Sequence, residues 1–158
     1  MTTTYRSLYK STLGWLNIEA NNKGITRVEF FDENPLPDQH ENILTQTAKR
    51  QLEEYFTGHR TQFELPLAPK GTDFQHRCWQ ALQAIPYGET RSYADQALAI
   101  QKPNAVRAVG TANGANPLSI VVPCHRVIGK SGKLTGYAGG LDRKENLLKW
   151  EKLNAKGD

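Results

Sequence analysis

The stretch SYADQALAIQKPNAVRAVGTANG, residues 92–114, decides the fold of the second half of the chain. Ser92 is a typical helix N-cap, and the apolar residues after it recur at helical spacing up to a turn at Gln101 to Pro103. Asn104 is the expected N-cap of a second helix, which the Asn113-Gly114 pair ends. Two short helices joined by a tight turn predict a helix-turn-helix.

The expected second helix carries mostly small side chains, in the run Ala105-Val106-Arg107-Ala108-Val109-Gly110-Thr111-Ala112. Small side chains allow the backbone of a helix to come very close to whatever it faces. That partner is either a ligand such as nucleic acid or another helix of the same protein, and the pattern alone leaves both open.

The first half predicts a small sheet and a helix. Two runs, residues 13–20 and 24–31, alternate apolar with polar residues on either side of an Asn-Asn-Lys-Gly turn, which is typical of antiparallel strands. Apolar residues at spacings of three and four then predict a helix over about 41–57, which Gly58 stops. Residues 65–71 contain two prolines and are the expected linker.

After this linker, Thr72 and Gln75 form a capping-box pattern that opens a helix, and Pro86 ends it. Cys78 falls on the apolar face of that helix and is expected in the core. The chain is therefore predicted to be α/β (α+β), with a small sheet-and-helix domain over 1–70. A mostly helical domain with the helix-turn-helix follows over 71–158.

Composition limits the possible functions. The chain has 158 residues, 38% of them apolar, which is enough to bury a core without disulfides. Its two cysteines are too few for a zinc cluster or a disulfide scaffold, and no segment resembles a signal peptide or a membrane span, so we expect a cytoplasmic protein. A net charge of +4 permits a polyanionic partner, but charge alone favours a mildly basic, solvated surface.

An apolar run, residues 118–122, leads directly into Pro123-Cys124-His125-Arg126. A cysteine beside a histidine is weak evidence of chemistry, because most buried cysteines are inert. A thiol becomes a nucleophile only as the thiolate, which needs a base, and that base needs an acceptor to orient it.

The last helix offers such an acceptor. Asp142 is its expected N-cap, and Leu147 and Leu148 lie on its buried face. Glu151 follows these leucines by four and three residues, so helical geometry turns it toward the core. The alternative is a glutamate that frays into solvent near the chain's end.

The motif Pro123-Cys124-His125-Arg126-Val127 resembles the active-site motif of the O6-alkylguanine-DNA alkyltransferases, and the match extends over about 74–151. Its supporting positions are Pro86-Tyr87-Gly88, Ser92-Tyr93, Arg107-Ala108-Val109-Gly110, Asn113 to Pro117, Gly136 to Leu141 and Lys144-Glu145. The first half matches only in its order of strands and helix, as the family's ribonuclease-H-like N-terminal domain would.

The resemblance implies DNA repair by direct, stoichiometric and irreversible transfer of an alkyl group, such as methyl, from O6-alkylguanine to Cys124, without indicating which alkyl group is preferred. O4-alkylthymine is a second candidate substrate. His125 would remove the thiol proton through a water, and Glu151 would orient His125. Tyr93 would give its proton to N3 of the leaving guanine, and Asn116 would be the hinge between the recognition helix and the active-site segment.

The resemblance also implies binding of double-stranded DNA by a monomer through the minor groove, with the alkylated nucleotide flipped out and Arg107 in the gap. The expected DNA contacts are Ala105, Arg107, Ala108, Gly110, Thr111, Asn113, Tyr137 and Ala138. Many relatives have serine at the position of Ala138, so only backbone N–H groups could meet the guanine O6 there. The ligands of the zinc found in some relatives are absent, so neither metal nor cofactor is expected.

Three other functions compete with this interpretation. Some relatives carry tryptophan in place of the cysteine and only mark damage, which Cys124 argues against. A thiol hydrolase built on Cys124, His125 and Glu151 would turn over many times. A transcription regulator would use the helix-turn-helix, but no separate sensor or dimerisation domain is evident.

Overall fold

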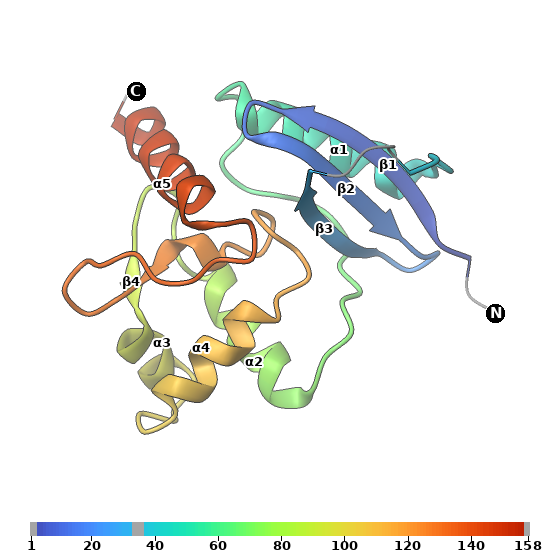
Figure 1. The fold of residues 1–158 in the computed structure, drawn as a ribbon. Helices are drawn as coiled ribbons and strands as arrows, with labels where there is room; N and C mark the ends of the chain where they lie inside the picture. Colours follow the sequence, from blue (N-terminus) through green and yellow to red (C-terminus); the bar gives the residue numbers. More distant parts are fainter. Residues whose placement is uncertain (1–2, 33–36, 157–158) are drawn as a thin grey trace. The chain divides into compact units, whose positions relative to one another are not determined.

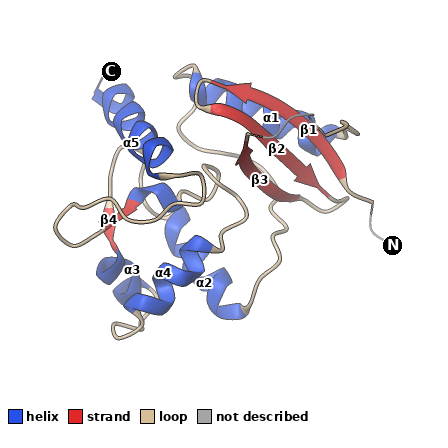
Figure 2. Cartoon of the chain, viewed as in Figure 1, coloured by secondary structure: helices blue, strands red, loops and turns tan. Residues whose placement is uncertain are grey.

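The computed structural model describes residues 3–32 and 37–156, and its chain divides into two compact units, residues 1–70 and 71–158 (Figure 1). The first unit is a sheet with a helix and the second is mostly helical, as the colouring of Figure 2 makes plain. The predicted mixed α/β fold class is therefore confirmed. None of the helices in these described ranges is long and apolar enough to cross a membrane.

The first unit is an antiparallel sheet in the order β1-β2-β3, with one helix packed on it. Its elements are β1 (Tyr5–Ser11), β2 (Gly14–Ala20), β3 (Ile25–Phe31) and α1 (Ile43–Phe56). Helix α1 contacts all three strands along one face of the sheet (Figure 1). The core between them consists mainly of Leu16, Ile18, Ile25, Val28, Ala48, Leu52 and Tyr55.

The sequence pattern missed β1 because its inward positions are not apolar. Ser7 faces α1, where its hydroxyl bonds to that of Thr45 at 2.8 Å, and Ser11 is also buried. The helix begins at Ile43, with Asn42 as its N-cap, slightly later than expected.

The expected linker also begins later than predicted. The Ile25 amide donates to the carbonyl of Pro66 at 2.8 Å, and the amide of Ala68 donates back to Ile25 at 2.8 Å. Residues 66–68 are thus held to the edge of the sheet, and only the last part of the 65–71 segment is free to act as a linker.

In the second unit, helices α2 (Asp73–Gln83), α3 (Tyr93–Ala99) and α4 (Val106–Gly114) pack against one another. The two predicted caps are confirmed: Thr72 with Gln75, and Ser92 with Asp95, form complete capping boxes. Each such cap typically stabilises a helix by about 1 kcal/mol. These caps fix where α2 and α3 begin.

The predicted helix-turn-helix consists of α3 and α4, and its turn is closed by backbone hydrogen bonds. The amides of Gln101 and Lys102 donate to the last carbonyls of α3, with Gln101 at a φ of 62°. The prediction for Asn104 is wrong, because the N-cap of α4 is Ala105 and makes no side-chain cap. Tight closure of the turn leaves Asn104 one residue too early.

Helix α5 (Leu141–Lys156) completes the second unit, with a two-strand parallel pairing of β4 (Arg91–Ser92) and β5 (Val127–Ile128). Asp142 lies in the first turn of α5 and not at its N-cap, because the ladder begins with Lys144 donating to the carbonyl of Gly140. Gly88, at a φ of 83°, allows close approach to α5, since a Cβ there would lie 2.9 Å from that of Ala155.

Candidate active site

Two tight turns lead the chain from α4 to Cys124. The amide of Val121 donates to the carbonyl of Ser119 at 2.8 Å around Ile120, whose φ is 72°. The amide of Cys124 donates to Val122, also at 2.8 Å, around Pro123. A positive φ at a β-branched residue is strained, and such strain is concentrated at functional sites.

Asn116 fixes this segment from within. Its amide nitrogen donates to the carbonyl of Val122 at 2.8 Å, and its oxygen accepts from the backbone amide of Leu118 at 2.9 Å. Asn116 directly follows the C-cap of α4, so it connects the end of that helix to the turn before Cys124. This is where the sequence placed the hinge residue.

Cys124, His125 and Arg126 form a short 3-10 helix, η1, and all three side chains are buried. The pairing of β4 with β5 directly after η1 brings Ser92 opposite Ile128, so the start of α3 and its Tyr93 lie beside this segment. The segment after α4 and the start of α3 are therefore both held close to η1.

His125 and Glu151 are paired, so the prediction that Glu151 turns inward is confirmed and fraying is excluded. Nε2 of His125 lies 2.7 Å from Oε2 of Glu151, and neither side chain is more than 1% exposed. An ionised carboxylate only accepts hydrogen bonds, so Nε2 donates. Nδ1 of His125 is buried without a hydrogen-bond partner, which makes it the nitrogen free to accept a proton.

Arg126 holds the same carboxylate from another side, and this partner was missed by the sequence analysis. Its Nε donates to Glu151 Oε1 at 2.7 Å, and its Nη1 donates to the carbonyl of Ile85 at 2.8 Å. Its guanidinium lies 5.6 Å from the ring centre of Tyr87. A buried arginine requires such a carboxylate partner, but nothing in the local sequence marks Arg126 as buried.

The charge on Glu151 is secured by these contacts. Burial alone would raise its pKa, but His125 and the guanidinium of Arg126 outweigh burial and lower the pKa of Glu151 to about 2. Glu151 is therefore ionised at every physiological pH, and it keeps the proton of His125 on Nε2.

Burial raises the pKa of the Cys124 thiol, while a hydrogen bond from Asn116 and the charge of Lys144 act in the opposite direction. Cys124 therefore rests as a thiol that needs a base. Lys144, on α5, is fully buried, and the sequence analysis gave it no role beyond its place in the motif. Burial lowers its pKa, and Cys124 partly restores it.

Tyr93 is in contact with the loop over residues 134–140, which we call the pocket loop. The hydroxyl of Tyr93 lies 2.6 Å from that of Thr135. Burial raises the pKa of Tyr137, and ionisation of the neighbouring Cys124 would raise it further, so Tyr137 lies near the sulfur. Ala138, in the same loop, is exposed.

The expected DNA-contact residues of α4 lie mostly on one open surface. Arg107, Ala108 and Thr111 are exposed, and Ala105 and Gly110 are partly exposed. Asn113 is different: it is buried, and its amide exchanges two hydrogen bonds, of 2.8 and 2.9 Å, with that of Gln96. Asn113 therefore orients α4 against α3 instead of facing a ligand.

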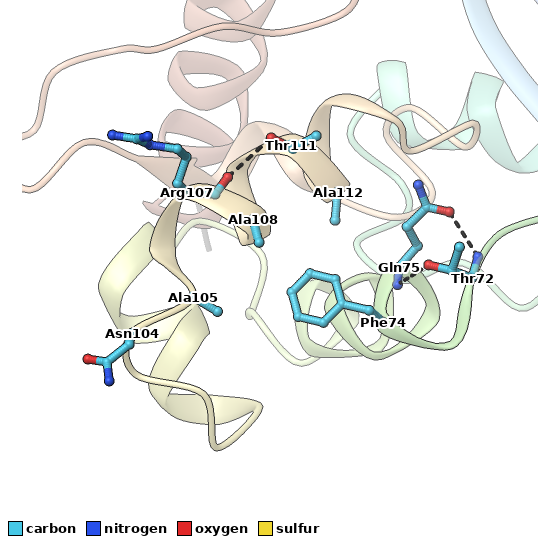
Figure 3. A pocket seen from close by; sticks show the side chains of 9 residues that line it. All are labelled: Thr72, Phe74, Gln75, Asn104, Ala105, Arg107, Ala108, Thr111 and Ala112. Atoms are coloured by element: carbon cyan, nitrogen blue, oxygen red, sulfur yellow. Dashed lines mark hydrogen bonds between the residues drawn. The ribbon is translucent and has the colours of Figure 1, made fainter.

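A hollow of about 610 Å³ lies between the start of α2 and α4 (Figure 3). Phe74 points into it, opposite the small side chains of Ala105 and Ala108, while the guanidinium of Arg107 extends away from it (Figure 3). The small residues of α4 thus leave open space on its outer side, and Val109 and Ala112 pack inside.

Cys78 is fully buried on α2, and burial raises the pKa of its thiol, as its predicted core position requires. The described residues contain no group of three His, Cys, Asp or Glu side chains that could hold a metal ion. Of the two cysteines, Cys124 directly precedes a histidine that is hydrogen-bonded to a glutamate, and Cys78 does not.

The second unit combines a helix-turn-helix, which is typical of DNA-binding proteins, with a cysteine next to a buried histidine–glutamate pair. This combination indicates a DNA-binding protein that uses a thiol for chemistry. Two family models match the chain: "6-O-methylguanine DNA methyltransferase, ribonuclease-like domain" over residues 4–69, and the DNA binding domain of the same family over residues 73–153. The chain belongs to the methylated-DNA–protein-cysteine methyltransferase family.

Curated relatives and solved structures agree. The chain is 49% identical to the Methanosarcina barkeri methylated-DNA–protein-cysteine methyltransferase, over 95% of this chain and 98% of the relative. It is 48% identical to the constitutive enzyme of Bacillus subtilis, over 96% and 98%. The Mycobacterium tuberculosis O6-methylguanine methyltransferase crystal structure matches with a TM-score of 0.88 at 44% identity, covering 99% and 97%. The same organism's protein in complex with DNA gives 0.85 at 46%, covering 93% and 92%.

Proposed function

We propose that this protein repairs DNA by moving an alkyl group from O6-alkylguanine to the sulfur of Cys124, once and irreversibly. The observation that carries the proposal is the buried His125–Glu151 pair directly after Cys124, with Nδ1 of His125 free to accept a proton. Family membership and the DNA complex of a relative support the same substrate class.

In the proposed reaction, Nδ1 of His125 takes the thiol proton of Cys124 through a water molecule, and Glu151 stabilises the imidazolium that results. The thiolate attacks the alkyl carbon, so that an S–C bond forms as the C–O bond to guanine breaks. Tyr93 gives its hydroxyl proton to N3 of the departing base, which neutralises the developing negative charge. The product is a thioether that no group in the site is placed to hydrolyse.

For DNA, we propose binding of the duplex as a monomer through its minor groove, with the small-residue surface of α4 at the phosphates and sugar edges. Ala105, Ala108, Gly110 and Thr111 permit the close approach, and Arg107 fills the stack when the damaged nucleotide is flipped out. Tyr137 and the backbone at Ala138 would line the pocket for the extruded base. The buried position of Asn113 supports a role in orienting α4.

The proposal is tested by mixing the protein with duplex DNA that contains O6-methylguanine, followed by intact-mass and peptide mass spectrometry. We expect a gain of one methyl group per protein, on the Cys124 peptide, with Cys78 unmodified. Cys124→Ser should bind the DNA but abolish transfer, and Cys78→Ser should retain it. Repeated turnover without a mass gain would indicate a thiol hydrolase, and methyl on Cys78 would mean that the nucleophile is misassigned.

A further inference from the structure

Two hydrogen bonds connect three residues from separate elements, and one of the three, Lys144, acts electrostatically on Cys124. The hydroxyls of Tyr93, at the start of α3, and Thr135, in the pocket loop, are 2.6 Å apart. Nζ of Lys144, on α5, donates to the backbone carbonyl of Thr135 at 3.0 Å and lies 6.0 Å from the ring centre of Tyr93. Thr135 therefore connects Tyr93 to Lys144, through its hydroxyl on one side and its backbone carbonyl on the other.

This arrangement constrains Thr135 more than a loop residue normally is. Lys144 is fully buried, so its ammonium cannot leave for solvent, and its bond to the carbonyl fixes the backbone of Thr135. With its backbone held in this way, the hydroxyl of Thr135 is presented to Tyr93. Thr135 as a whole is only partly buried.

We propose that Thr135 is a positioning residue for alkyl transfer, which orients the hydroxyl of Tyr93 toward the leaving guanine and replaces the proton that Tyr93 gives up. The inference rests on the proposed function and extends it to a residue outside the Cys124–His125–Glu151 set. Lys144 acts in it as the anchor that holds Thr135 in place.

The protons balance in this scheme. As sulfur bonds to the alkyl carbon and the C–O bond breaks, the Tyr93 proton passes to N3 of the base. The Thr135 hydroxyl then donates its own proton to the phenolate oxygen of Tyr93 and takes one from solvent water. The net change is one proton from solvent to guanine, which matches the loss of the thiolate charge at Cys124.

The test compares two substitutions of Thr135 that differ in one group. Thr135→Val keeps the size and branching of the side chain but removes the hydroxyl, while Thr135→Ser keeps the hydroxyl. Single-turnover rates are measured with free O6-benzylguanine, which reports the chemistry without DNA binding. We expect Thr135→Val to slow transfer by about 10- to 100-fold, within the usual range for general-acid effects, and Thr135→Ser to stay within a few-fold of the parent.

Two further readouts separate positioning from a merely structural role. The 8-aza analogue of O6-benzylguanine has a more stable leaving anion and needs less protonation, so the defect of Thr135→Val should shrink with it. Alkylation of Cys124 by iodoacetamide involves no purine, so its rate should be unchanged. In a Tyr93→Phe background, Thr135→Val should cause no additional loss, because the hydroxyl that it serves is already absent.

Equal losses on both purines and on iodoacetamide would overturn the inference, since they would mean that Thr135 shapes the pocket. A rate for Thr135→Val equal to or above the parent would also overturn it, because the Tyr93–Thr135 bond would then have no part in alkyl transfer. Additive losses in the double variant would have the same consequence. Failure of the parent protein to transfer the methyl group of O6-methylguanine in duplex DNA to Cys124 would instead reject the proposed function.

Discussion

The two units bury polar side chains of different kinds. Among the described residues, the buried polar side chains of the first unit are all neutral: Ser7, Ser11, Asn17, Thr45 and Gln51. The second unit buries Arg126, Lys144 and Glu151 in addition to His125. A buried neutral group needs only its hydrogen bonds, whereas a buried ion is costly to desolvate and rarely adds net stability even when it is paired.

This difference indicates where the chain accepts a cost for chemistry. In the first unit, hydrogen bonds such as Ser7 to Thr45 serve the packing of a helix on a sheet. In the second unit, Glu151 is shared between His125 and Arg126, and Lys144 faces Cys124, so the charges converge on one thiol. We therefore expect the buried charged side chains of the second unit to be needed for activity, and the buried neutral side chains of the first unit to be needed only for stability.

The largest effect after loss of Cys124 itself is expected for Glu151→Gln. Without the carboxylate, His125 loses the partner that fixes its proton on Nε2, and transfer should slow by about 10²- to 10⁴-fold. Single-turnover rates on O6-benzylguanine measure this. Glu145→Gln is the matched control, because Glu145 lies on the same helix but is exposed and forms a surface ion pair with Lys149. An unchanged rate for Glu151→Gln would remove Glu151 from the mechanism.

The same substitution should change stability against acid. The folded state lowers the pKa of Glu151 from 4.5 to about 2, so its contribution is fully present above pH 4.5 and is lost as the pH falls toward 2. A shift of this size corresponds to about 3 kcal/mol. Denaturant unfolding followed from pH 6 to 2 should therefore show a shallower loss of stability in Glu151→Gln than in the parent.

A smaller effect is expected for Lys144→Met, which removes the cation that faces Cys124. The pKa of Cys124 should rise, and the pH–rate profile for its alkylation by iodoacetamide should therefore shift to higher pH. At pH 7 we expect a decrease of about tenfold, as loss of one nearby charge from a buried group implies. Lys149→Met, on the exposed face of α5, is the control. An unshifted pH profile would limit Lys144 to its contact with Thr135.

Much of this fold followed from local signals in the sequence. The caps at Thr72 and Ser92 and the inward turn of Glu151 depend only on residue type and helical spacing. Strand β1 was missed because Ser7 and Ser11 occupy its inward face, and the bond from Ser7 to Thr45 of α1 joins residues far apart in the sequence. Local patterns cannot reveal such tertiary compensation.

The residues of the candidate site also fall into two groups, those that the sequence predicted and those that only the structure shows. Cys124 and His125 were found by their motif, but the turns before them could not be, since Ile120 adopts a φ that its β-branched side chain disfavours. Arg126 and Lys144 carry no local sign of burial, because a charged residue is normally exposed. Only the fold shows that one meets Glu151 and the other Thr135.

Arg107→Ala tests an exposed charge of the second unit against its buried ones. Because Arg107 is exposed on α4 and is none of the groups proposed for the chemistry, its loss should slow repair of duplex DNA while free O6-benzylguanine reacts at close to the parent rate. Unstacking a base costs on the order of a few kcal/mol, part of which an inserted side chain can offset.

Single-turnover rates on both substrates, with affinity followed across salt concentration, distinguish the alternatives for Arg107. Equal losses on duplex and free base would assign it to the fold or the pocket. Weaker and less salt-dependent binding with a normal rate at saturation would mean that it only contacts a phosphate.

The smallest effect on chemistry is expected for Gln51→Ala, in the first unit. The Gln51 amide donates to the carbonyl of Glu64 at 3.1 Å and accepts from its backbone amide at 2.9 Å, which ties α1 to the chain that follows it. Removing it leaves two backbone groups without these bonds, and this should lower the free energy of unfolding by about 1–3 kcal/mol. Transfer from O6-benzylguanine should nevertheless proceed at the parent rate in the folded protein, because every group proposed for the reaction belongs to residues 71–158.

Gln96→Ala is the matched substitution in the second unit, where the Gln96 amide forms two hydrogen bonds with the side chain of Asn113 and so holds α4. It should lower stability as Gln51→Ala does, and it should also weaken duplex repair. If Gln51→Ala slowed transfer to the free base under conditions where the protein is fully folded, the first unit would contribute to the chemistry, and the division of roles between the two units would be wrong.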